Sequence, residues 1–373
     1  MGDYKKYYVL LAGSKNDAGD FLIKTRAKSL LAHYRKDRDF VDLDGWKKLS
    51  NEHIETINNA EALILTGGPS LQPGSRIENL IYPFIKELDK IKVPIYTFGV
   101  GYKGNKGTWG ENSDYAFSDL SMELLKRIDH SGGKSSVRDY HTLDVLQKKG
   151  FQNFVMTGCP ALYNVHDELK PISKLSIKRV GFSLGVSYKL NDSMKSLMEE
   201  MILSAASHFK DAEMIVYFHH KINAADKVQS KMISFLEKNE ISYMDISGTS
   251  EKLMSQYESC DLHLGFRVHA HIFCSSMGIP SILFSEDGRA IALKEVLNGL
   301  IYRAHEISGD NIPAKVLNRI GLKDRFVAVD GLVETIKNTI DYENRNGCIR
   351  FNQAFANITS HRKVMEDFIR DLP

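Results

Sequence analysis

The chain of 373 residues is longer than a typical single domain and fits two domains of ordinary size. Its hydrophobic share of 43% and charged share of 26% are those of a globular protein with a substantial core, which excludes a disordered chain. Lys and Arg total 49 against 47 for Asp and Glu, so no field of one sign indicates nucleic acid as a partner. No run of about 18 apolar residues suggests a membrane span.

The cysteines and the first residues indicate a cellular compartment. The stretch MGDYKKYYVLLAG passes from a short apolar run into a turn and lacks the cleavage region of a signal peptide. The four cysteines lie far apart and form no C-x-x-C pair, which fits free thiols in a reducing compartment. We therefore expect a cytoplasmic protein with no metal and no cofactor. These cysteines are Cys159, Cys260, Cys274 and Cys348.

In the first half, short β-rich apolar runs alternate with amphipathic stretches, which predicts βαβ crossovers and a parallel sheet. These elements would form one Rossmann-like domain at 1–165. The predicted strands are 7–13, 61–68, 94–101 and 153–158, and the predicted helices are 24–36, 77–90, 117–128 and 141–150.

A second series follows a connection at 159–178 that contains prolines and has no clear period. It predicts another Rossmann-like domain at 176–330, followed by C-terminal helices at 331–373. The fold class is therefore α/β, with two Rossmann-like domains facing across a cleft and ligands at the C-terminal ends of the strands. The predicted strands are 178–185, 213–220, 241–247, 261–267 and 280–286, and the helices are 190–208, 224–238, 250–258, 268–277 and 288–298, with two more between 333 and 369.

Polar residues and glycines at strand ends of the first half are candidates for substrate binding. Glycines let a backbone turn sharply or approach a ligand, although a simple strand-to-helix turn explains them equally. Neither G-x-G-x-x-G nor G-x-x-x-x-G-K-[ST] occurs, so the sequence contains neither a dinucleotide fingerprint nor a P-loop. The candidates are Asn16, Gly19, Asp20, Gly67, Gly68 and Arg138.

The strand ends of the second half are richer in ionisable groups. Successive residues of a strand point to opposite faces, so at most one of His219 and His220 faces a cleft. His269 and His271 lie two apart on a predicted helix and cannot readily share a metal. Arg267 is costly to bury unpaired, which indicates an anion nearby. The candidates of this half are Ser183, His219, Arg267, His269 and Glu286.

Several segments together resemble the polysaccharide pyruvyl transferase family. The stretch GFRVHAHIFCSSMGIPSI is similar to that family's G-x-R-[LV]-H-x-x-I-x-[AC]-x-x-x-G-x-P segment. NDAGDFLI, LILTGGPSL, FGVGYKG and SSVRDYHTLDVLQKKG follow the family's order upstream, so the resemblance covers roughly residues 7 to 300. The chain departs from the family where GCPA lacks an Asp and where FSEDGRAIALK replaces Y-D-x-K.

The resemblance implies an enzyme that moves the pyruvyl group of phosphoenolpyruvate onto two hydroxyls of a sugar as a ketal and releases phosphate. The acceptor would be a polysaccharide, such as an exopolysaccharide, or its lipid-linked precursor, with peripheral membrane association through that acceptor. Phosphoenolpyruvate would be the donor substrate, bound by the second domain, with the acceptor on the first.

Roles follow for four residues. Arg267 would clamp the donor's carboxylate or phosphate, and His269 would be the general acid. Asp20 would bind or deprotonate sugar hydroxyls, with a helix N-cap as the equal alternative. Arg138 would close on the donor from the first domain, or else pair structurally with Asp139.

Two other functions fit part of the pattern. A GT-B-like glycosyltransferase using a nucleotide sugar has the same two-domain outline, but Glu286 and Glu295 miss the spacing of its donor-binding glutamates. A non-catalytic module that binds a carbohydrate or an anion would explain the glycines and Arg267 but would leave His269 without a role. For the sugar that would receive the pyruvyl group, Trp109 and Tyr102 of the loop 101–115 are candidates to stack on the ring.

Overall fold

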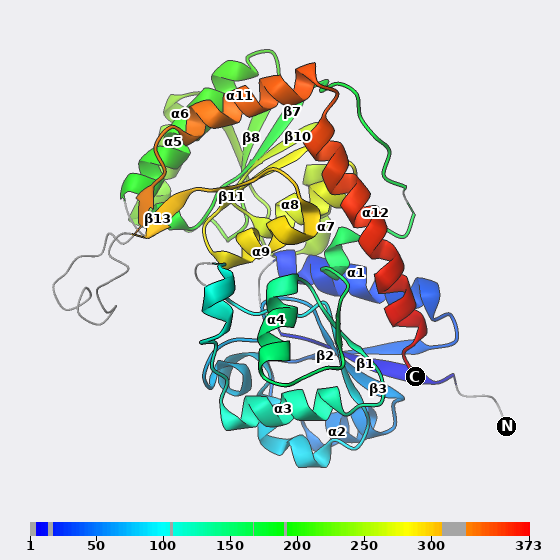
Figure 1. Cartoon of the computed structure of the whole chain (residues 1–373). Coiled ribbons are helices and arrows are strands. Elements are labelled where there is room, and N and C mark those ends of the chain that lie inside the picture. The colour runs from blue at the N-terminus through cyan, green and yellow to red at the C-terminus, as the bar shows by residue number, and fades with distance from the viewer. Residues whose placement is uncertain (1–4, 14–17, 105–106, 167, 190–191, 308–325) are drawn as a thin grey trace.

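The computed structural model of the protein describes residues 5–13, 18–104, 107–166, 168–189, 192–307 and 326–373. The chain forms two lobes, one above the other in Figure 1, and each lobe is built on a parallel β-sheet. This is the predicted α/β architecture of two facing Rossmann-like domains followed by C-terminal helices.

The sheet of the first lobe has four parallel strands in the order β2-β1-β3-β4. A further parallel pair, β5-β6, adjoins it through a bridge between Val100 and Val137. All five residues of β3 are buried, as expected for a strand whose two faces are both covered by helices or loops. The strands are β1 (Tyr7–Ala12), β2 (Asp39–Asp44), β3 (Ala62–Thr66), β4 (Ile95–Phe98), β5 (Ser135–Val137) and β6 (Phe154–Met156).

The helices of this lobe differ from the prediction at three places. α1 starts at Ala18, six residues before the predicted 24, and β2 with α2 lies in a stretch without predicted elements. β2 is an edge strand with a partly exposed, acidic face, so its sequence lacks an apolar run. The predicted helix 77–90 breaks before Pro83, which has no N–H to donate within a helix. The elements are α1 (Ala18–Tyr34), α2 (Asn51–Asn58), the π-helical turn η1 (Ile77–Ile81), the 3₁₀ helix η2 (Pro83–Lys90), α3 (Asp119–Asp129) and α4 (Tyr140–Lys148).

The sheet of the second lobe has six parallel strands in the order β12-β11-β10-β7-β8-β9. β10 and β7, at its centre, end at Gly265 and Ser183, which are register partners. The strands are β7 (Arg179–Ser183), β8 (Glu213–Phe218), β9 (Ser242–Asp245), β10 (Leu262–Gly265), β11 (Ser281–Ser285) and β12 (Ile301–Arg303), and the helices are α5 (Asp192–His208), α6 (Lys227–Lys238), α7 (Ser250–Glu258), α8 (Val268–Ser276) and α9 (Gly288–Leu297).

The C-terminal helices connect the two lobes. A small antiparallel pair, β13 (His305–Ile307) and β14 (Phe326–Ala328), precedes α11 (Leu332–Arg345), which packs on α5. α12 (Ile349–Arg370) then runs down beside both lobes in Figure 1 and contacts α9, α8 and α1. Phe368 meets Phe98 of the first lobe with ring centroids 5.4 Å apart, so the end of the chain is anchored there.

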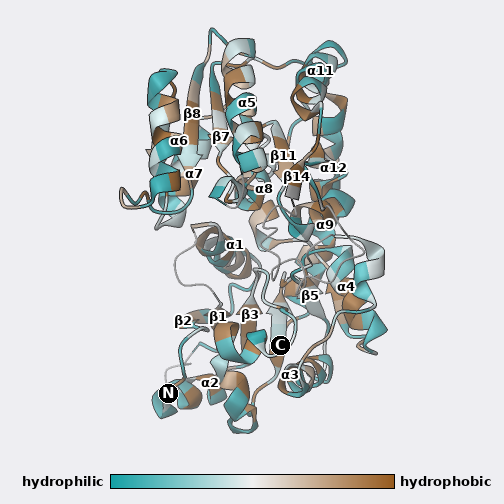
Figure 2. Cartoon of the chain, turned by 90° about the vertical axis from the view of Figure 1, so that its left-hand side faces the viewer, coloured by the Kyte–Doolittle hydropathy of each residue, from teal (hydrophilic) through white to brown (hydrophobic). Residues whose placement is uncertain are grey.

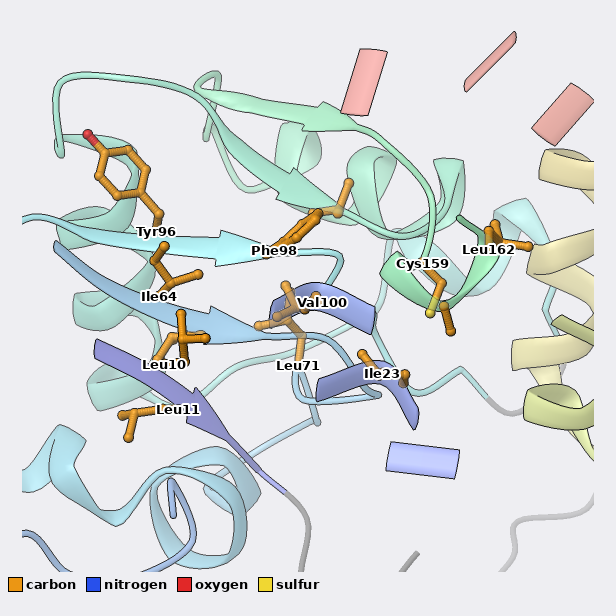
Figure 3. Close-up of a cluster of buried hydrophobic side chains, with 14 of the residues drawn as sticks. Leu10, Leu11, Ile23, Ile64, Leu71, Tyr96, Phe98, Val100, Cys159 and Leu162 are labelled. Carbon is orange, nitrogen blue, oxygen red and sulfur yellow. The ribbon is translucent and has the colours of Figure 1, made fainter. Parts of the chain in front are cut away.

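Hydrophobic side chains fill the space between each sheet and its helices. Figure 3 shows Leu10, Ile64 and Phe98 projecting from three neighbouring strands of the first lobe. Leu162 of the short helix η4 (Pro160–Leu162) and Cys159, which precedes that helix, close the same core near the second lobe. In Figure 2 hydrophilic residues colour the outer sides of the helices. None of the helices within the described ranges is both long and apolar enough to cross a bilayer.

Candidate functional site

The lobes meet where the C-terminal strand ends of the second sheet face the first lobe. α8 and α9 lie at the base of the upper lobe in Figure 1, close to α1 and α4. Contacts join α1 to α7 and α8, η4 to α8, and α4 to α9. Motif residues from the first half of the chain and motif residues from the second half therefore lie close together at this boundary.

The turn from β10 into α8 positions Arg267. Gly265 has a φ of +142°, and an added Cβ would lie 2.4 Å from the carbonyl oxygen and from Oγ of Ser183. Glycine thus lets the end of β10 lie directly on β7. The backbone N–H of Phe266 donates to the Ser183 carbonyl at 2.9 Å, and that of Arg267 to Ser183 Oγ at 3.0 Å. These bonds fix the backbone that carries Arg267 at the start of α8.

A hollow of about 160 Å³, called here the α8 hollow, lies at this turn. Arg267 Nη1 is 3.3 Å from His220 Nε2 at its wall. The pKa of Asp287 is lowered, because the charge and hydrogen bonds of Arg289 outweigh its burial, which acts to raise the pKa. Two arginines and two carboxylates line the hollow, with Arg289 paired to Asp287. The lining comprises Val186, His220, Phe266, Arg267, Val268, His269, Glu286, Asp287 and Arg289.

Glu286 has a structural task at this wall. Its carboxylate accepts the backbone N–H groups of Val186 at 2.8 Å and of Ser187 at 2.7 Å. An added Cβ on Gly185 would lie 2.2 Å from Oε1 of Glu286. The predicted substrate-binding residue Glu286 thus lines the hollow while it ties down the turn after β7.

His269 meets the first lobe at Asp20. The distance from His269 Nε2 to Asp20 Oδ1 is 3.8 Å, and the histidine is only 6% exposed. An added Cβ on Gly19 would lie 1.8 Å from His269 Nδ1, so only glycine allows the first turn of α1 to lie against the imidazole. Asp20 Oδ1 is buried and has no hydrogen-bond partner among the described residues. Asp20 of the first motif and His269 of the second, about 250 residues apart in the chain, thus lie close together.

Asp20 also lines a second hollow of about 360 Å³ in the first lobe, called here the α1 hollow. Gly67 and Gly68 form part of its wall with φ values of +48° and +74°. An added Cβ on Gly67 would lie 1.9 Å from Cγ2 of Ile23, so the turn after β3 packs closely on α1. The contact between Asp20 and His269 stands between the two hollows. The lining comprises Ala12, Gly13, Asp20, Ile23, Thr66, Gly67, Gly68, Pro69, Ser70, Gln72, Leu80 and Ile81.

Two predicted binding residues lie beneath the α8 hollow instead of lining it. Ser183 is completely buried, and His219 is buried with its Nε2 2.8 Å from the hydroxyl of Tyr257. Successive strand residues face opposite ways, and it is His220 that reaches the hollow and Arg267. The sequence pattern identified the pair of histidines and could not select the member that faces the site.

Arg138 lies near the boundary between the two lobes, and its guanidinium already has partners within the first lobe. Its Nε is 3.2 Å from Asp139 Oδ2, and its Nη2 donates to the Tyr102 carbonyl at 3.1 Å. Asp139 caps α4 by accepting from the backbone N–H of Thr142. Arg138 lines neither hollow, yet its charge contributes to the low pKa of Asp287 across the boundary. Asn16 lies outside the described residues.

A buried hydrogen-bond network, which the sequence analysis did not predict, supports the turn from β10 into α8. His263 Nε2 is 2.9 Å from Ser183 Oγ, and His263 Nδ1 is 2.7 Å from Ser281 Oγ. His271 Nδ1 is 2.6 Å from the same hydroxyl. Burial lowers the pKa of His271 to about 3, and burial with the neighbouring His271 lowers that of His263. The signal in the sequence was a histidine between two leucines of a central strand.

The described side chains offer no metal site. No group of three or more His, Cys, Asp and Glu residues among them is arranged to hold an ion. His271, two residues from His269, is buried against Ser281 on the inner side of α8.

Comparisons with solved structures define the class of fold. Similar structures are S. aureus MnaA with UDP (TM-score 0.54, 10% identity, covering 99% of both chains) and Neisseria meningitidis UDP-GlcNAc 2-epimerase with UDP-GlcNAc (TM-score 0.54, 8% identity, covering 99% of this chain and 100% of that one). A putative UDP-N-acetylglucosamine 2-epimerase from Listeria monocytogenes has a TM-score of 0.52 at 12% identity, covering 99% and 98% of the chains. At these identities the similarity shows the shared fold, which is GT-B.

The family follows from the sequence. The model of the polysaccharide pyruvyl transferase family matches residues 3–288, so the chain belongs to this family, as the motif resemblance predicted. Membership places it among transferases of polysaccharide biosynthesis. No curated protein is similar enough in sequence to count as a match.

Proposed function

We propose that the protein transfers the pyruvyl group of phosphoenolpyruvate onto two hydroxyls of one sugar in a polysaccharide or its lipid-linked precursor. The products are a ketal and phosphate. One observation carries this proposal: Arg267 and His269 line the same hollow, and His269 meets Asp20 of the opposite lobe at 3.8 Å. A clamp for anions, a proton donor and a carboxylate thus lie at the boundary of two hollows.

The α8 hollow suits the donor. Phosphoenolpyruvate carries a carboxylate and a phosphate, and a guanidinium can bind either with two parallel hydrogen bonds. Arg267 and His220 bring two nitrogen-bearing side chains to the lining, where Arg289 is paired with Asp287. The first turn of α8 adds the backbone N–H groups and the positive end of a helix. The second domain is therefore the proposed donor side.

In the proposed reaction His269 donates a proton to the methylene carbon, which becomes a methyl group while positive charge develops on the adjacent carbon. One sugar hydroxyl adds to that carbon, with Asp20 accepting its proton. The bond from carbon to the phosphate oxygen breaks, and the second hydroxyl adds in its place. One of the two hydroxyl protons restores His269, and the other leaves with hydrogen phosphate, so charge and atoms balance.

The acceptor is assigned to the α1 hollow. Asp20 lines it and has a buried oxygen without a hydrogen-bond partner among the described residues. An oxygen of that kind is stabilised by a hydroxyl donor, and a sugar supplies one. With a lipid-linked sugar in this hollow, the protein would associate with a membrane through its substrate.

The second candidate is a glycosyl transfer or related reaction on a nucleotide sugar. It is favoured by the similar structures, one of which contains UDP and another UDP-GlcNAc. Against it, Glu286, the strand-end glutamate that would hold such a donor, accepts hydrogen bonds from Val186 and Ser187.

Ligand-induced stabilisation separates the two candidates. Phosphoenolpyruvate should raise the melting temperature of the purified protein, and UDP-GlcNAc should not, because only a ligand that binds the native state stabilises it. His269→Ala should retain the stabilisation by phosphoenolpyruvate and lower phosphate release by roughly 10²- to 10⁴-fold, as expected for loss of a general acid.

Stabilisation by UDP-GlcNAc alone would favour the second candidate. Undiminished phosphate release by His269→Ala, with acceptor-dependent turnover in the unaltered chain, would remove the histidine from the mechanism.

A further inference from the structure

The loop between β4 and α3 presents an exposed tryptophan on a rigid base. Trp109 begins the 3₁₀ helix η3 (Trp109–Asn112) and is 47% exposed. Its ring is stacked on His141 of α4 with centroids 3.9 Å apart and planes inclined by 19°. Tyr102 lies nearly parallel to the same imidazole at 6.3 Å and is buried, so it is unavailable to a ligand. Of the two predicted stacking residues, Trp109 has the exposed ring.

The base of the stack is fixed by its own hydrogen bonds. Asn112 Nδ2 lies 3.3 Å from His141 Nδ1 and donates to Asp144 Oδ2 at 2.8 Å. Burial lowers the pKa of His141, which keeps the imidazole neutral at neutral pH. A tryptophan held in this way loses little conformational entropy when a ligand stacks on it.

A hollow of about 730 Å³, called here the loop hollow, lies beside η3, and Trp109 is not among the residues that line it. Thr108 and Gly110, the chain neighbours of Trp109, are part of its lining. Arg76, Lys103 and Asp114 also line it. The full lining is Pro73, Gly74, Arg76, Lys103, Thr108, Gly110, Glu111, Asp114, Tyr115 and Ala116.

The loop hollow lies next to both hollows of the candidate site. An added Cβ on Gly107 would lie 2.8 Å from Cβ of Ile291 and 2.9 Å from the Gly288 carbonyl, so this loop packs on the first turns of α9. Arg289 of the α8 hollow is close enough that its charge, after burial, lowers the pKa of Lys103. On the other side, Gln72 lines the α1 hollow and the next residue, Pro73, lines the loop hollow.

We propose that Trp109 and the loop hollow form a carbohydrate subsite, which binds a sugar of the acceptor chain beyond the one that receives the pyruvyl group. The apolar C–H face of a pyranose packs on an indole, and its hydroxyls both donate and accept hydrogen bonds. Arg76 and Lys103 supply donors to such hydroxyls, and Glu111 and Asp114 supply acceptors. Its role as an acceptor subsite rests on the proposed function.

Fluorescence tests the subsite without turnover. The chain has two tryptophans, so Trp46→Phe leaves Trp109 as its only one. The titrants are di- and tetrasaccharides that end in galactose, glucose or N-acetylglucosamine. We expect a saturable change in emission with at least one tetrasaccharide, weaker in Asp114→Ala. Absence of any response across this panel overturns the proposal.

Steady-state kinetics with a tetrasaccharide acceptor provide a second test of the subsite. Trp109→Ala should raise KM for the tetrasaccharide about tenfold and leave kcat and the KM for phosphoenolpyruvate unchanged, with Trp109→Phe close to the unaltered chain. Tyr342→Ala on α11, an aromatic residue that is also 47% exposed, is the matched control and should change neither constant.

The two proposals fail separately. Saturable glycan binding without any use of phosphoenolpyruvate would remove the proposed reaction and keep the carbohydrate subsite. Turnover of a tetrasaccharide whose KM is unaffected by Trp109→Ala would remove the subsite and keep the reaction.

Discussion

Arg267 shows how much one residue depends on its surroundings. The pattern R-x-H predicted a cation and an imidazole at a strand end, and both side chains line the α8 hollow. The partners come from elsewhere in the chain: Ser183 Oγ accepts the backbone N–H of Arg267, and His220 contacts its guanidinium. Because the backbone is fixed, the direction of the guanidinium is restricted, which a bidentate clamp requires.

Arg267→Lys tests the clamp. Lysine keeps the charge but presents a point donor, so the second of two parallel hydrogen bonds is lost. We expect the Kd for phosphoenolpyruvate, measured by calorimetry, to rise roughly ten- to hundredfold, as for loss of a charge-assisted hydrogen bond. Arg127→Lys on α3, where the arginine donates to the Ile91 carbonyl, is the control. An unchanged affinity in Arg267→Lys would contradict the bidentate contact.

At the scale of elements, the contact of α1 with α8 assembles the site. α1 begins near the end of β1 and α8 near the end of β10, so the C-terminal ends of two sheets face each other here. Gly19 makes the approach possible, since any side chain at that position would overlap His269. The glycine was identified in the sequence as a substrate-binding candidate, and the structure gives it this packing role.

Gly19→Ala tests that packing. Alanine favours a helix by about 1 kcal/mol over glycine, so the helix itself should not suffer. Its Cβ would lie 1.8 Å from His269 Nδ1 and displace the imidazole. A displacement of this kind should lower kcat for phosphate release on the order of 100-fold, with a smaller effect on affinity for phosphoenolpyruvate. Gly133→Ala, whose Cβ would meet nothing closer than 3.4 Å, should behave as the unaltered chain. Full activity of Gly19→Ala would separate His269 from the chemistry.

At the scale of the whole molecule, buried polar groups couple stability to pH. Burial lowers the pKa of His271 to about 3, and the pKa of His263 is lowered as well. The unfolded chain binds protons at both positions below their ordinary pKa near 6.5, and the folded chain does not. The stability that these neutral histidines provide is therefore complete above about pH 6.5 and is lost as the pH falls toward 3.

Urea unfolding near pH 7 and near pH 5.5 measures this effect. Each histidine should lower the free energy of unfolding by about 1 kcal/mol between these two pH values, because the unfolded-state pKa near 6.5 lies inside the window and the slope approaches its limit of about 1.4 kcal/mol per pH unit only below it. His271→Gln should reduce the dependence on pH, whereas His130→Gln, at an exposed position after α3, should not. A free energy of unfolding that is constant from neutral to mildly acidic pH would contradict neutral, buried histidines.

The sequence alone determined the class of fold, most of the buried strands, the two C-terminal helices and the family motifs. It could do so because apolar periodicity and short motifs are local properties of the chain. It missed β2, whose edge position leaves no apolar run, and it did not foresee the break at Pro83 between η1 and η2.

Only the tertiary structure decided which motif residues meet. It brought Asp20 to His269, selected His220 over His219 and placed Ser183 in a buried chain beneath Arg267. It also left Trp109 exposed and buried Tyr102, although both lie in one loop. These outcomes depend on contacts between residues far apart in the chain, within each lobe and, for Asp20 and His269, between the lobes, so they arise only from tertiary packing.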